Sequence, residues 1–365
     1  DASGPFGYLA EKASTNLAIY SEEFDQWSSG QVTVVANVAV APDGTTTMDR
    51  AAVGTGNLWH AVYRLITTPV NTNYTYSVYM KDDGAGFGGL TMGTVEDYIT
   101  VVVDLSSGLV THTGVGSNSG TIIASGCEDA GNGIYRVWIS GNVGTTNGYT
   151  IPFVSNAAVP SVWQYGRPYY TGVAGEDILV WGAQVELGTY PTSYIATTTS
   201  GVTRNGDALI AGDMVTDAAG SGYAEVSQPD GATANAYALN RSALGRILYK
   251  GVAAVGSIRA YDGTNLSDAP NGPSRASTPI SAASTWGDAL TAYYNAVPDA
   301  TPAAYDGTMG TGNLGIGNNQ AGSEQWQGTV REVKIFNSEL TAAEVGDLSP
   351  APVPPAPAQF DWLGQ

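Results

Sequence analysis

The chain has 365 residues and a formal net charge of −19, because 33 acidic residues outnumber 14 lysines and arginines. So few cations argue against a nucleic-acid partner, and the lack of a run of about 18 apolar residues argues against membrane insertion. A hydrophobic content of 43% excludes wholesale disorder. The 47 glycines have no three-residue period, which excludes collagen and predicts many turns.

Short runs of alternating apolar residues follow one another along the chain, at residues 32–40, 74–80, 99–105, 134–139 and 178–185. They are rich in Tyr, Val and Thr, a composition typical of half-buried strands. Turn dipeptides such as Asp43-Gly44 and Asn132-Gly133 separate the runs. This spacing predicts an all-β chain of two tandem antiparallel β-sandwiches or barrels rather than of βαβ units.

Residues 196–206 contain few large side chains, so we place a boundary there between a first domain at 1–203 and a second at 204–348. The second domain ends with an alternating run at 328–336, in which Val330 and either Val333 or Ile335 are expected to face inward. A short helix is predicted next, because Thr341 and Glu344 have the spacing of a capping box.

Residues 349–365 form a proline-rich tail for which we predict an extended spacer without a fold of its own. Phe360, Trp362 and Leu363 lie beyond the prolines. Large apolar side chains on a tether are a liability in water, so we expect this segment to dock onto a neighbouring surface. A disordered end is the alternative.

Residues suited to catalysis or redox chemistry are sparse. The two histidines, His60 and His112, have no metal-ligand spacing. Cys127 is the single cysteine, which permits neither an internal disulfide nor a zinc cluster. We expect it to be a small, buried or half-buried side chain. No cofactor is expected from these residues.

Acidic residues leave two alternatives open. Glu23 and Asp25, two residues apart, would share one face of a strand, and paired carboxylates are the groups that hydrolyse glycosidic bonds. Glu22 and Glu23, together with a distant carboxylate such as Glu186, would provide oxygen ligands for calcium. A solvated acidic turn is the simpler interpretation.

Aromatic residues are the strongest functional signal, with 21 Tyr and 8 Trp. Their rings combine an apolar face with a polar group, which suits stacking on sugars and hydrogen bonding to hydroxyls. Gly166 and Pro168 favour exposed rings in the denser of two aromatic groups. We expect a glycan-binding surface made of Trp59, Tyr63, Trp163, Tyr165, Tyr169 and Tyr170. The alternative is that these rings fill the core or cover a sheet.

Several segments of the first domain occur in an order found in a known module. They are residues 7–11, 15–24 with Trp27, 40–47, 74–79, 104–108, 128–136, 180–186 and 190–194. In these segments the chain resembles a carbohydrate-binding-like jelly-roll module of bacteriophage tail-fibre and head-fibre proteins. Residues 204–348 resemble the concanavalin-like, or laminin-G-like, sandwich that often follows it, best at residues 328–348.

The resemblance implies a non-enzymatic structural protein on the virion surface, outside the host cell, and it transfers no catalytic residue. We expect a fibre or capsid decoration protein that contacts other virion proteins and host-surface polysaccharide. Weak single contacts would be multiplied over many copies, and we expect a homo-oligomer. An architectural cement protein without a ligand is one alternative, and a polysaccharide depolymerase acting through Glu22, Glu23 or Asp25 is another.

Overall fold

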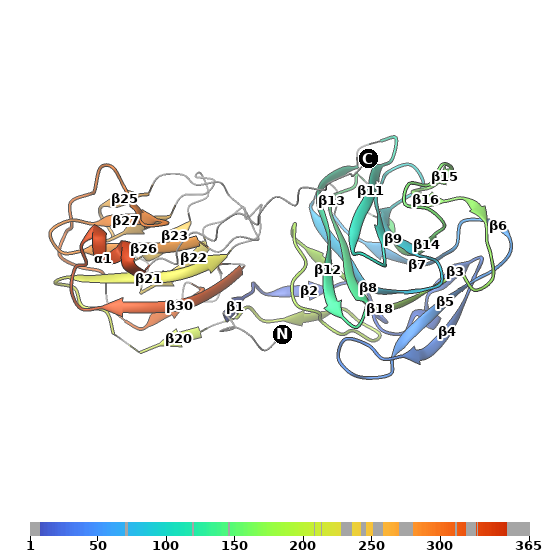
Figure 1. The fold of residues 1–365 in the computed structure, drawn as a ribbon, viewed down its shortest axis with the longest axis horizontal. Coiled ribbons are helices and arrows are strands. Elements are labelled where there is room, and N and C mark those ends of the chain that lie inside the picture. Colours follow the sequence, from blue (N-terminus) through green and yellow to red (C-terminus); the bar gives the residue numbers. More distant parts are fainter. Residues whose placement is uncertain are drawn as a thin grey trace, which may run out of the picture. The chain divides into compact units, whose positions relative to one another are not determined.

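The computed structural model describes residues 8–69, 72–118, 120–144, 147–207, 209–212, 214–227, 236–241, 246–250, 258–269, 280–310, 312–318, 326 and 328–348. The chain divides into two compact units. The first is Ser14–Asn205, and the second combines the residues before Ser14 with those from Gly206 onward. Both consist of antiparallel sheets, which confirms the expected all-β fold (Figure 1). Phe360, Trp362 and Leu363 of the expected docking tail lie outside the described residues.

The first unit contains two six-stranded sheets, which we call the front and back sheets. The front sheet has the order β11-β10-β9-β14-β7-β3. Its strands are β3 (Ser28–Gly30), β7 (Ala61–Thr67), β9 (Phe87–Gly93), β10 (Tyr98–Asp104), β11 (Leu109–Val115) and β14 (Asn147–Ser155). The back sheet has the order β12-β13-β8-β18-β5-β4. Its strands are β4 (Val32–Ala39), β5 (Met48–Val53), β8 (Tyr74–Asp83), β12 (Thr121–Gly131), β13 (Ile134–Asn142) and β18 (Asp177–Leu187).

The main core of the first unit is formed by alternate residues of both sheets. Ile99, Val101 and Val103 of β10 belong to it and are fully buried, as are Val78 and Met80 of β8. This alternation follows from the two-residue period of a strand, which sends successive side chains to opposite faces. The five runs of alternating residues in this unit therefore become strands β4, β8, β10, β13 and β18, as predicted.

Three short ladders complete the first unit. They pair β2 (Ser14–Asn16) with β19 (Val202–Arg204), β6 (Asn57–Leu58) with β17 (Tyr170–Thr171), and β15 (Trp163–Gln164) with β16 (Arg167–Pro168). Residues Phe24–Gln26 form a 3-10 helix, η1. Glu23 and Asp25 therefore flank Phe24 in a tight turn, and the expectation that they share one face of a strand is wrong. The buried ring of Phe24 and its N–H, which donates to Asp49 Oδ2, fix this turn on the core.

The second unit also has two six-stranded sheets. One has the order β1-β30-β21-β26-β27-β28 and the other β20-β29-β22-β23-β24-β25. The first comprises β1 (Tyr8–Ala10), β21 (Gly220–Ser227), β26 (Ile280–Trp286), β27 (Thr291–Tyr294), β28 (Val297–Pro298) and β30 (Gly328–Phe336). The second comprises β20 (Leu209–Ala211), β22 (Ala236–Asn240), β23 (Arg246–Lys250), β24 (Arg259–Tyr261), β25 (Leu266–Asp268) and β29 (Leu314–Ile316). Because β1 pairs with β30, residues 8–13 belong to this unit, whereas the boundaries drawn from the sequence placed them in the first.

Strand β30 and the helix after it show how local sequence shapes the end of the second unit. Val330 is buried in the core and both Val333 and Ile335 pack against it. The strand shifts register opposite Ala224, and Glu332 adopts a φ of 52°, so the alternation is reset between Val330 and Val333.

Helix α1 (Ala342–Leu348) begins with the predicted capping box. Thr341 N donates to Glu344 Oε2 at 2.8 Å, and Glu344 N donates to Thr341 Oγ1 at 3.3 Å.

Over the described part of the chain, we find no helix with the length and apolar character needed to span a bilayer.

Candidate functional site

The outer face of the front sheet carries adjoining aromatic rings. Tyr63 in β7 and Tyr149 in β14 point away from the main core, because their neighbours Val62 and Thr150 are the buried residues of the alternation. The ring centroids of Trp59 and Tyr63 lie 5.7 Å apart, and those of Tyr63 and Tyr149 also lie 5.7 Å apart, both in edge-to-face geometry. The side chain of Tyr149 is 40% exposed, so this row of rings ends at the solvent.

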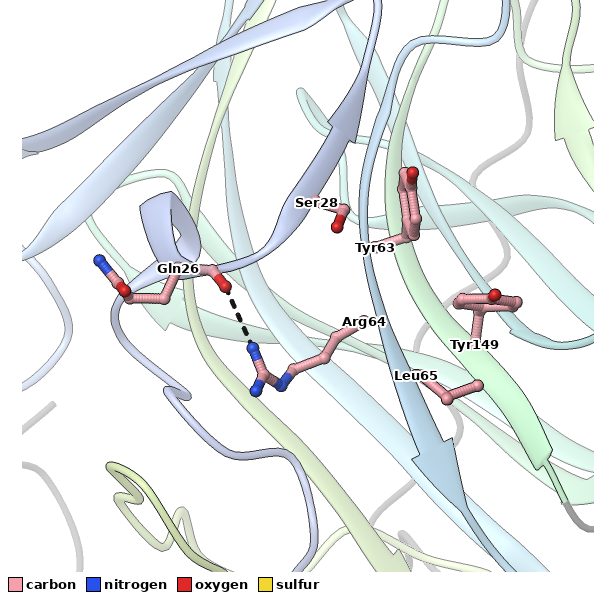
Figure 2. Close-up of a pocket in the computed structure, with 6 residues that line it drawn as sticks. All are labelled: Gln26, Ser28, Tyr63, Arg64, Leu65 and Tyr149. Carbon is pink, nitrogen blue, oxygen red and sulfur yellow. Dashed lines mark hydrogen bonds between the residues drawn. The ribbon is translucent and has the colours of Figure 1, made fainter.

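A depression of about 320 Å³ lies beside these rings (Figure 2). It is lined by Gln26, Ser28, Tyr63, Arg64, Leu65 and Tyr149. Strand β3 pairs with β7 along Ala61–Tyr63, and the depression lies beside the residues that follow in β7, Arg64 and Leu65. Arg64 reaches across this edge and donates from Nη1 to the backbone oxygen of Gln26 at 3.1 Å. The depression has the volume of a small ligand site and offers both ring faces and polar groups.

A two-residue hairpin between β15 and β16 holds a further ring on this face. Tyr165 and Gly166 form the turn with φ values of 56° and 76°, the combination of a type I′ turn. The carbonyl oxygen of Gly166 accepts from the hydroxyls of Thr91, at 2.6 Å, and Thr100, at 2.9 Å, which fixes the hairpin on strands β9 and β10. Tyr165 is a bulky residue in the left-handed region, a strained conformation that places its ring 43% exposed to solvent.

Arg167 follows this turn and lies among the rings. Its guanidinium carbon is 4.4 Å from the ring of Trp59 and 5.7 Å from that of Tyr165, and the residue is 8% exposed. Burial lowers its pKa to about 10, an effect that Tyr63, Tyr165 and Tyr149 oppose electrostatically. The guanidinium is therefore charged at neutral pH. We call Trp59, Tyr63, Tyr149, Tyr165 and Arg167 the aromatic–arginine surface.

Three of the six aromatic residues predicted from the sequence, Trp59, Tyr63 and Tyr165, are brought together in this surface. The hairpin residue Trp163 packs against the same apolar cluster of the outer face as Trp59 and Tyr63. Its ring stacks on His112 at 4.9 Å, and its Nε1 donates to the Pro160 oxygen at 2.8 Å. Tyr169 is half-buried.

Tyr170 is 9% exposed, and its ring lies 4.5 Å from that of His60. Its hydroxyl is buried and has no hydrogen-bond partner among the described residues. The ring of Tyr170 therefore lies against His60 beside the β6–β17 ladder rather than against the rings of the aromatic–arginine surface, and Tyr170 is not part of that surface.

Tyr149 and Arg167 are the two members of the surface that the sequence prediction missed. Tyr149 begins the alternating series Tyr149, Ile151, Phe153, in which the last two residues are buried on the outer face of the front sheet. This period of two is a signal that was available in the sequence. Arg167 lies within the aromatic group at residues 163–170 of the sequence. Its contact with Trp59, which is distant in sequence, could not be predicted from that position.

Glu186, the carboxylate considered for calcium, is completely buried and fully engaged in hydrogen bonds. It accepts from Ser14 Oγ at 2.5 Å, Gln184 Nε2 at 2.6 Å, and the N–H and hydroxyl of Thr192, both at 2.7 Å. These contacts join β18 to β2 through Ser14, and to the segment that follows β18 through Thr192. The motif containing Glu186 therefore has a structural role in the first unit.

Asn16 belongs to another motif of the resemblance and is also completely buried. Its Nδ2 donates to the oxygens of Ala183, at 2.9 Å, and Ile195, at 2.8 Å. Its Oδ1 accepts from the N–H groups of Ala18 and Val185. The side-chain amide thus uses all four of its hydrogen bonds to hold three segments together.

The remaining acidic candidates lie near the start of the first unit. Glu22 accepts from the Tyr194 hydroxyl at 3.1 Å, and burial raises the pKa of Glu22. Glu23 and Asp25 are exposed. No group of three His, Cys, Asp or Glu side chains in the described residues is arranged to hold a metal ion.

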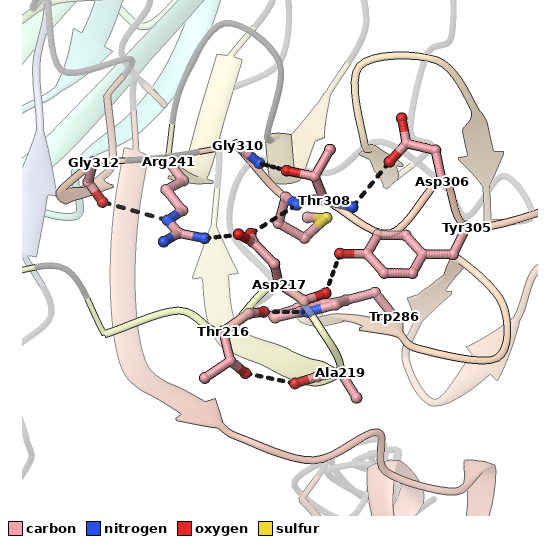
Figure 3. Close-up of polar contacts among 11 residues, drawn as sticks. Thr216, Asp217, Ala219, Arg241, Trp286, Tyr305, Asp306, Thr308, Gly310 and Gly312 are labelled. Atoms are coloured by element: carbon pink, nitrogen blue, oxygen red, sulfur yellow. Dashed lines mark hydrogen bonds and ion pairs between the residues drawn. The ribbon is translucent and has the colours of Figure 1, made fainter.

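The second unit has a polar cluster among its loops (Figure 3). Asp217 Oδ1 accepts from Arg241 Nη1 at 2.8 Å and from Met309 N at 3.1 Å, and the Asp217 carbonyl accepts from the Tyr305 hydroxyl at 2.5 Å. Arg241 Nε also donates to the oxygen of Gly312 at 3.4 Å. These groups satisfy one another, so the cluster holds the loops together.

Comparison with known proteins identifies one region. Residues 227–346 match the model of a family described as the concanavalin A-like lectin/glucanases superfamily. A search of curated proteins gives no match. The second unit of the chain therefore carries a concanavalin A-like lectin/glucanase-type domain, as the sequence predicted.

Proposed function

We propose that this chain is a non-enzymatic carbohydrate-binding protein and that the aromatic–arginine surface is its sugar contact. The observation that carries the proposal is the pair of half-exposed rings, Tyr149 at 40% and Tyr165 at 43%, on the same face as a 320 Å³ depression. The concanavalin-like domain in the second unit supports the same class of ligand.

The chemistry of the surface suits a sugar. Tyr149 and Tyr165 offer apolar ring faces for the C–H side of a pyranose, while Ser28 and Arg64 line the depression with hydrogen-bonding groups. Such a shallow contact binds weakly at one site, and its strength comes from repetition over many copies. A homo-oligomer on a particle surface would supply that repetition.

We further propose that the protein acts on the outside of a bacteriophage virion, as a fibre or decoration protein that contacts host-surface polysaccharide and other virion proteins. The ordered motifs between residues 7 and 203 support this, as does the concanavalin-like domain that follows them. Asn16 and Glu186, which belong to those motifs, hold the first unit together and leave the ring-bearing face free to vary with the host.

The proposal is tested by a double variant, Tyr149→Ala with Tyr165→Ala, in purified protein assayed on a panel of immobilised bacterial polysaccharides. Removing two stacking rings is expected to weaken binding by about tenfold or more, since each aromatic contact contributes about 1 kcal/mol. Leu109→Ala is the matched control. It removes a side chain that is 65% exposed on β11 of the same sheet, and binding should not change.

Full binding by the double variant would show that this face is not the contact. If the unaltered protein binds no polysaccharide, and particles lacking it break more readily on heating, the architectural cement function replaces the proposal. Release of reducing sugar by the pure protein would contradict the non-enzymatic assignment.

A further inference from the structure

Three arginines with described side chains are more than nine-tenths buried, and two of them have polar partners. Arg241, 5% exposed, pairs with the Asp217 carboxylate at 2.8 Å. Arg136, 6% exposed, donates from Nη2 to Ser77 Oγ at 3.1 Å and lies beside Glu128, whose carboxylate it stabilises electrostatically. Buried charges are normally matched in this way, because removing an unpaired ion from water costs several kcal/mol.

Arg167 is the exception among the three. It is 8% exposed, and its contacts within the described residues are the rings of Trp59 and Tyr165. Its Nε is buried without a hydrogen-bond partner among the described residues, as is the Nε of Arg136. Aromatic rings attract the positive charge but do not replace the carboxylate or carbonyl oxygens that five N–H donors require. Arg167 thus differs from the other two arginines in that no carboxylate, carbonyl or hydroxyl oxygen of the described residues accepts from its guanidinium.

Among the described residues, the electrostatic partners of Arg167 are tyrosines rather than carboxylates. Tyr63 and Tyr149 belong both to the rings around Arg167 and to the wall of the depression. Of the six residues that line the depression, Arg64 is the charged one, and it is a cation. In a chain with a net charge of −19, Arg64 and Arg167 place two cations on this part of the face.

We propose that Arg167 is held unpaired to receive an anionic group of the sugar, so that the aromatic–arginine surface selects acidic glycans. This inference rests on the proposed carbohydrate binding and adds the class of ligand. The planar fork of a guanidinium pairs in a bidentate manner with carboxylate, and its donors also suit sulfate. The pyranose ring would lie against Tyr149 or Tyr165 while its acidic substituent meets Arg167.

The test compares acidic polymers with matched neutral ones on the full chain. Polygalacturonate is paired with its methyl ester and alginate with its propylene glycol ester for the carboxylate arm, and dextran sulfate with dextran for the sulfate arm. The unaltered protein should bind at least one acidic polymer about tenfold or more tightly than its neutral partner, the difference expected for a charge-assisted hydrogen bond. The Arg167→Met variant should lose that difference.

Arg50→Met is the charge-matched control. Arg50 lies in β5 of the back sheet and pairs with Asp83 at 2.6 Å, so its removal changes the net charge equally but leaves the surface intact. The preference for the acidic polymer should survive in this variant. Arg167→Lys, which keeps the charge and the aliphatic stem but loses the fork, should retain a smaller preference and serves as the second variant if Arg167→Met does not fold.

The inference is overturned if the Arg167 variants keep the full preference, or if Arg50→Met loses it equally. Equal binding to each acidic polymer and its neutral partner would leave the carbohydrate-binding proposal standing and remove the selection by charge. If the protein binds neither polymer of any pair, the result counts against both the selection of acidic glycans and the carbohydrate-binding proposal.

Discussion

Glu186 is a residue whose role can be tested directly. Its buried carboxylate accepts four hydrogen bonds from Ser14, Gln184 and Thr192. In Glu186→Gln one acceptor becomes an amide donor that faces other donors, so we expect the unfolding free energy of the first unit to fall by about 3 kcal/mol.

Scanning calorimetry measures this change, and the first unit should unfold at a lower temperature in the variant. Glu23→Gln is the control, because Glu23 is exposed and its substitution should have little effect. A Glu186→Gln protein as stable as the unaltered one would show that the hydrogen bonds of this carboxylate are not needed.

His60 should make stability depend on pH. Burial lowers the pKa of His60, and its Nε2 donates to the Gly54 oxygen at 3.0 Å, as expected of a neutral imidazole. In the unfolded chain a histidine has a pKa of about 6.5, so the unfolded state takes up the proton first. Stability contributed by neutral His60 is therefore present above that pH and decreases as the pH falls through it.

We expect His60→Gln to flatten the loss of stability between pH 7 and pH 5, since glutamine can still donate to Gly54 but does not titrate. Urea unfolding of both proteins at several pH values measures the slope. An unchanged slope in the variant would mean that other groups produce the acid sensitivity.

Sequence reasoning located part of the candidate surface and could not complete it. The density of rings around Trp59 and Trp163 was visible in the sequence, and it led to Trp59, Tyr63 and Tyr165. That Tyr170 is covered by His60 depends on the pairing of β17 with β6, which brings distant segments together. The unpaired state of Arg167 depends on every segment around it, so no local pattern could reveal it.

At the scale of elements, the β15–β16 hairpin is the part that positions the surface. A Cβ atom at Gly166 would lie 2.7 Å from Tyr98 Cδ2 and 2.8 Å from Thr91 Cγ2, and its φ of 76° favours glycine. Gly166→Ala should therefore lift the hairpin from the sheet and move Tyr165 and Arg167. We expect about tenfold weaker glycan binding with a loss of stability of about 1–2 kcal/mol.

Gly44→Ala provides the matched control for this prediction. Gly44 has a φ of 86° and open space where its Cβ would lie, so the substitution brings the same backbone strain without displacing a neighbour. Its binding should stay at the unaltered level in the same polysaccharide assay. Equal loss of binding in both variants would mean that general destabilisation is the cause.

The strands of the first unit and the final helix could be predicted because their signals are local. The runs at 99–105 and 134–139 alternate in hydrophobicity, and Thr341 with Glu344 forms the expected cap. The 3-10 turn at Phe24–Gln26 was not predictable in this way, since it depends on contacts with distant residues: the Phe24 ring is buried in the core and its N–H donates to Asp49. The bulge at Glu332 has no pattern of its own in the sequence.

At the scale of the whole molecule, the net charge of −19 should oppose the approach of an acidic glycan to the proposed contact at Arg167. The screening length falls from about 30 Å at 10 mM salt to about 8 Å at 150 mM, while partly buried contacts are screened less. We therefore expect association with an acidic polymer to become faster over this range of salt.

Surface plasmon resonance on the immobilised polymer measures the association rate, and the neutral partner polymer should show little change. This direction is opposite to that of proteins that bind polyanions through a large basic surface. An association rate that falls steadily with salt would indicate that overall charge does not limit the encounter.

The pairing of β1 with β30 means that the first unit interrupts the second along the chain. A truncated protein that begins at residue 204 would lack β1, and the edge of β30 that pairs with β1 would be exposed. Unpaired backbone groups on such an edge favour aggregation with other copies. The first unit has the opposite property, because Ser14 lies across the β2–β19 ladder from Arg204 and its two ends emerge together. It has the layout of an inserted domain, which can be removed or exchanged at a single loop of the second unit without breaking a strand of its own sheets.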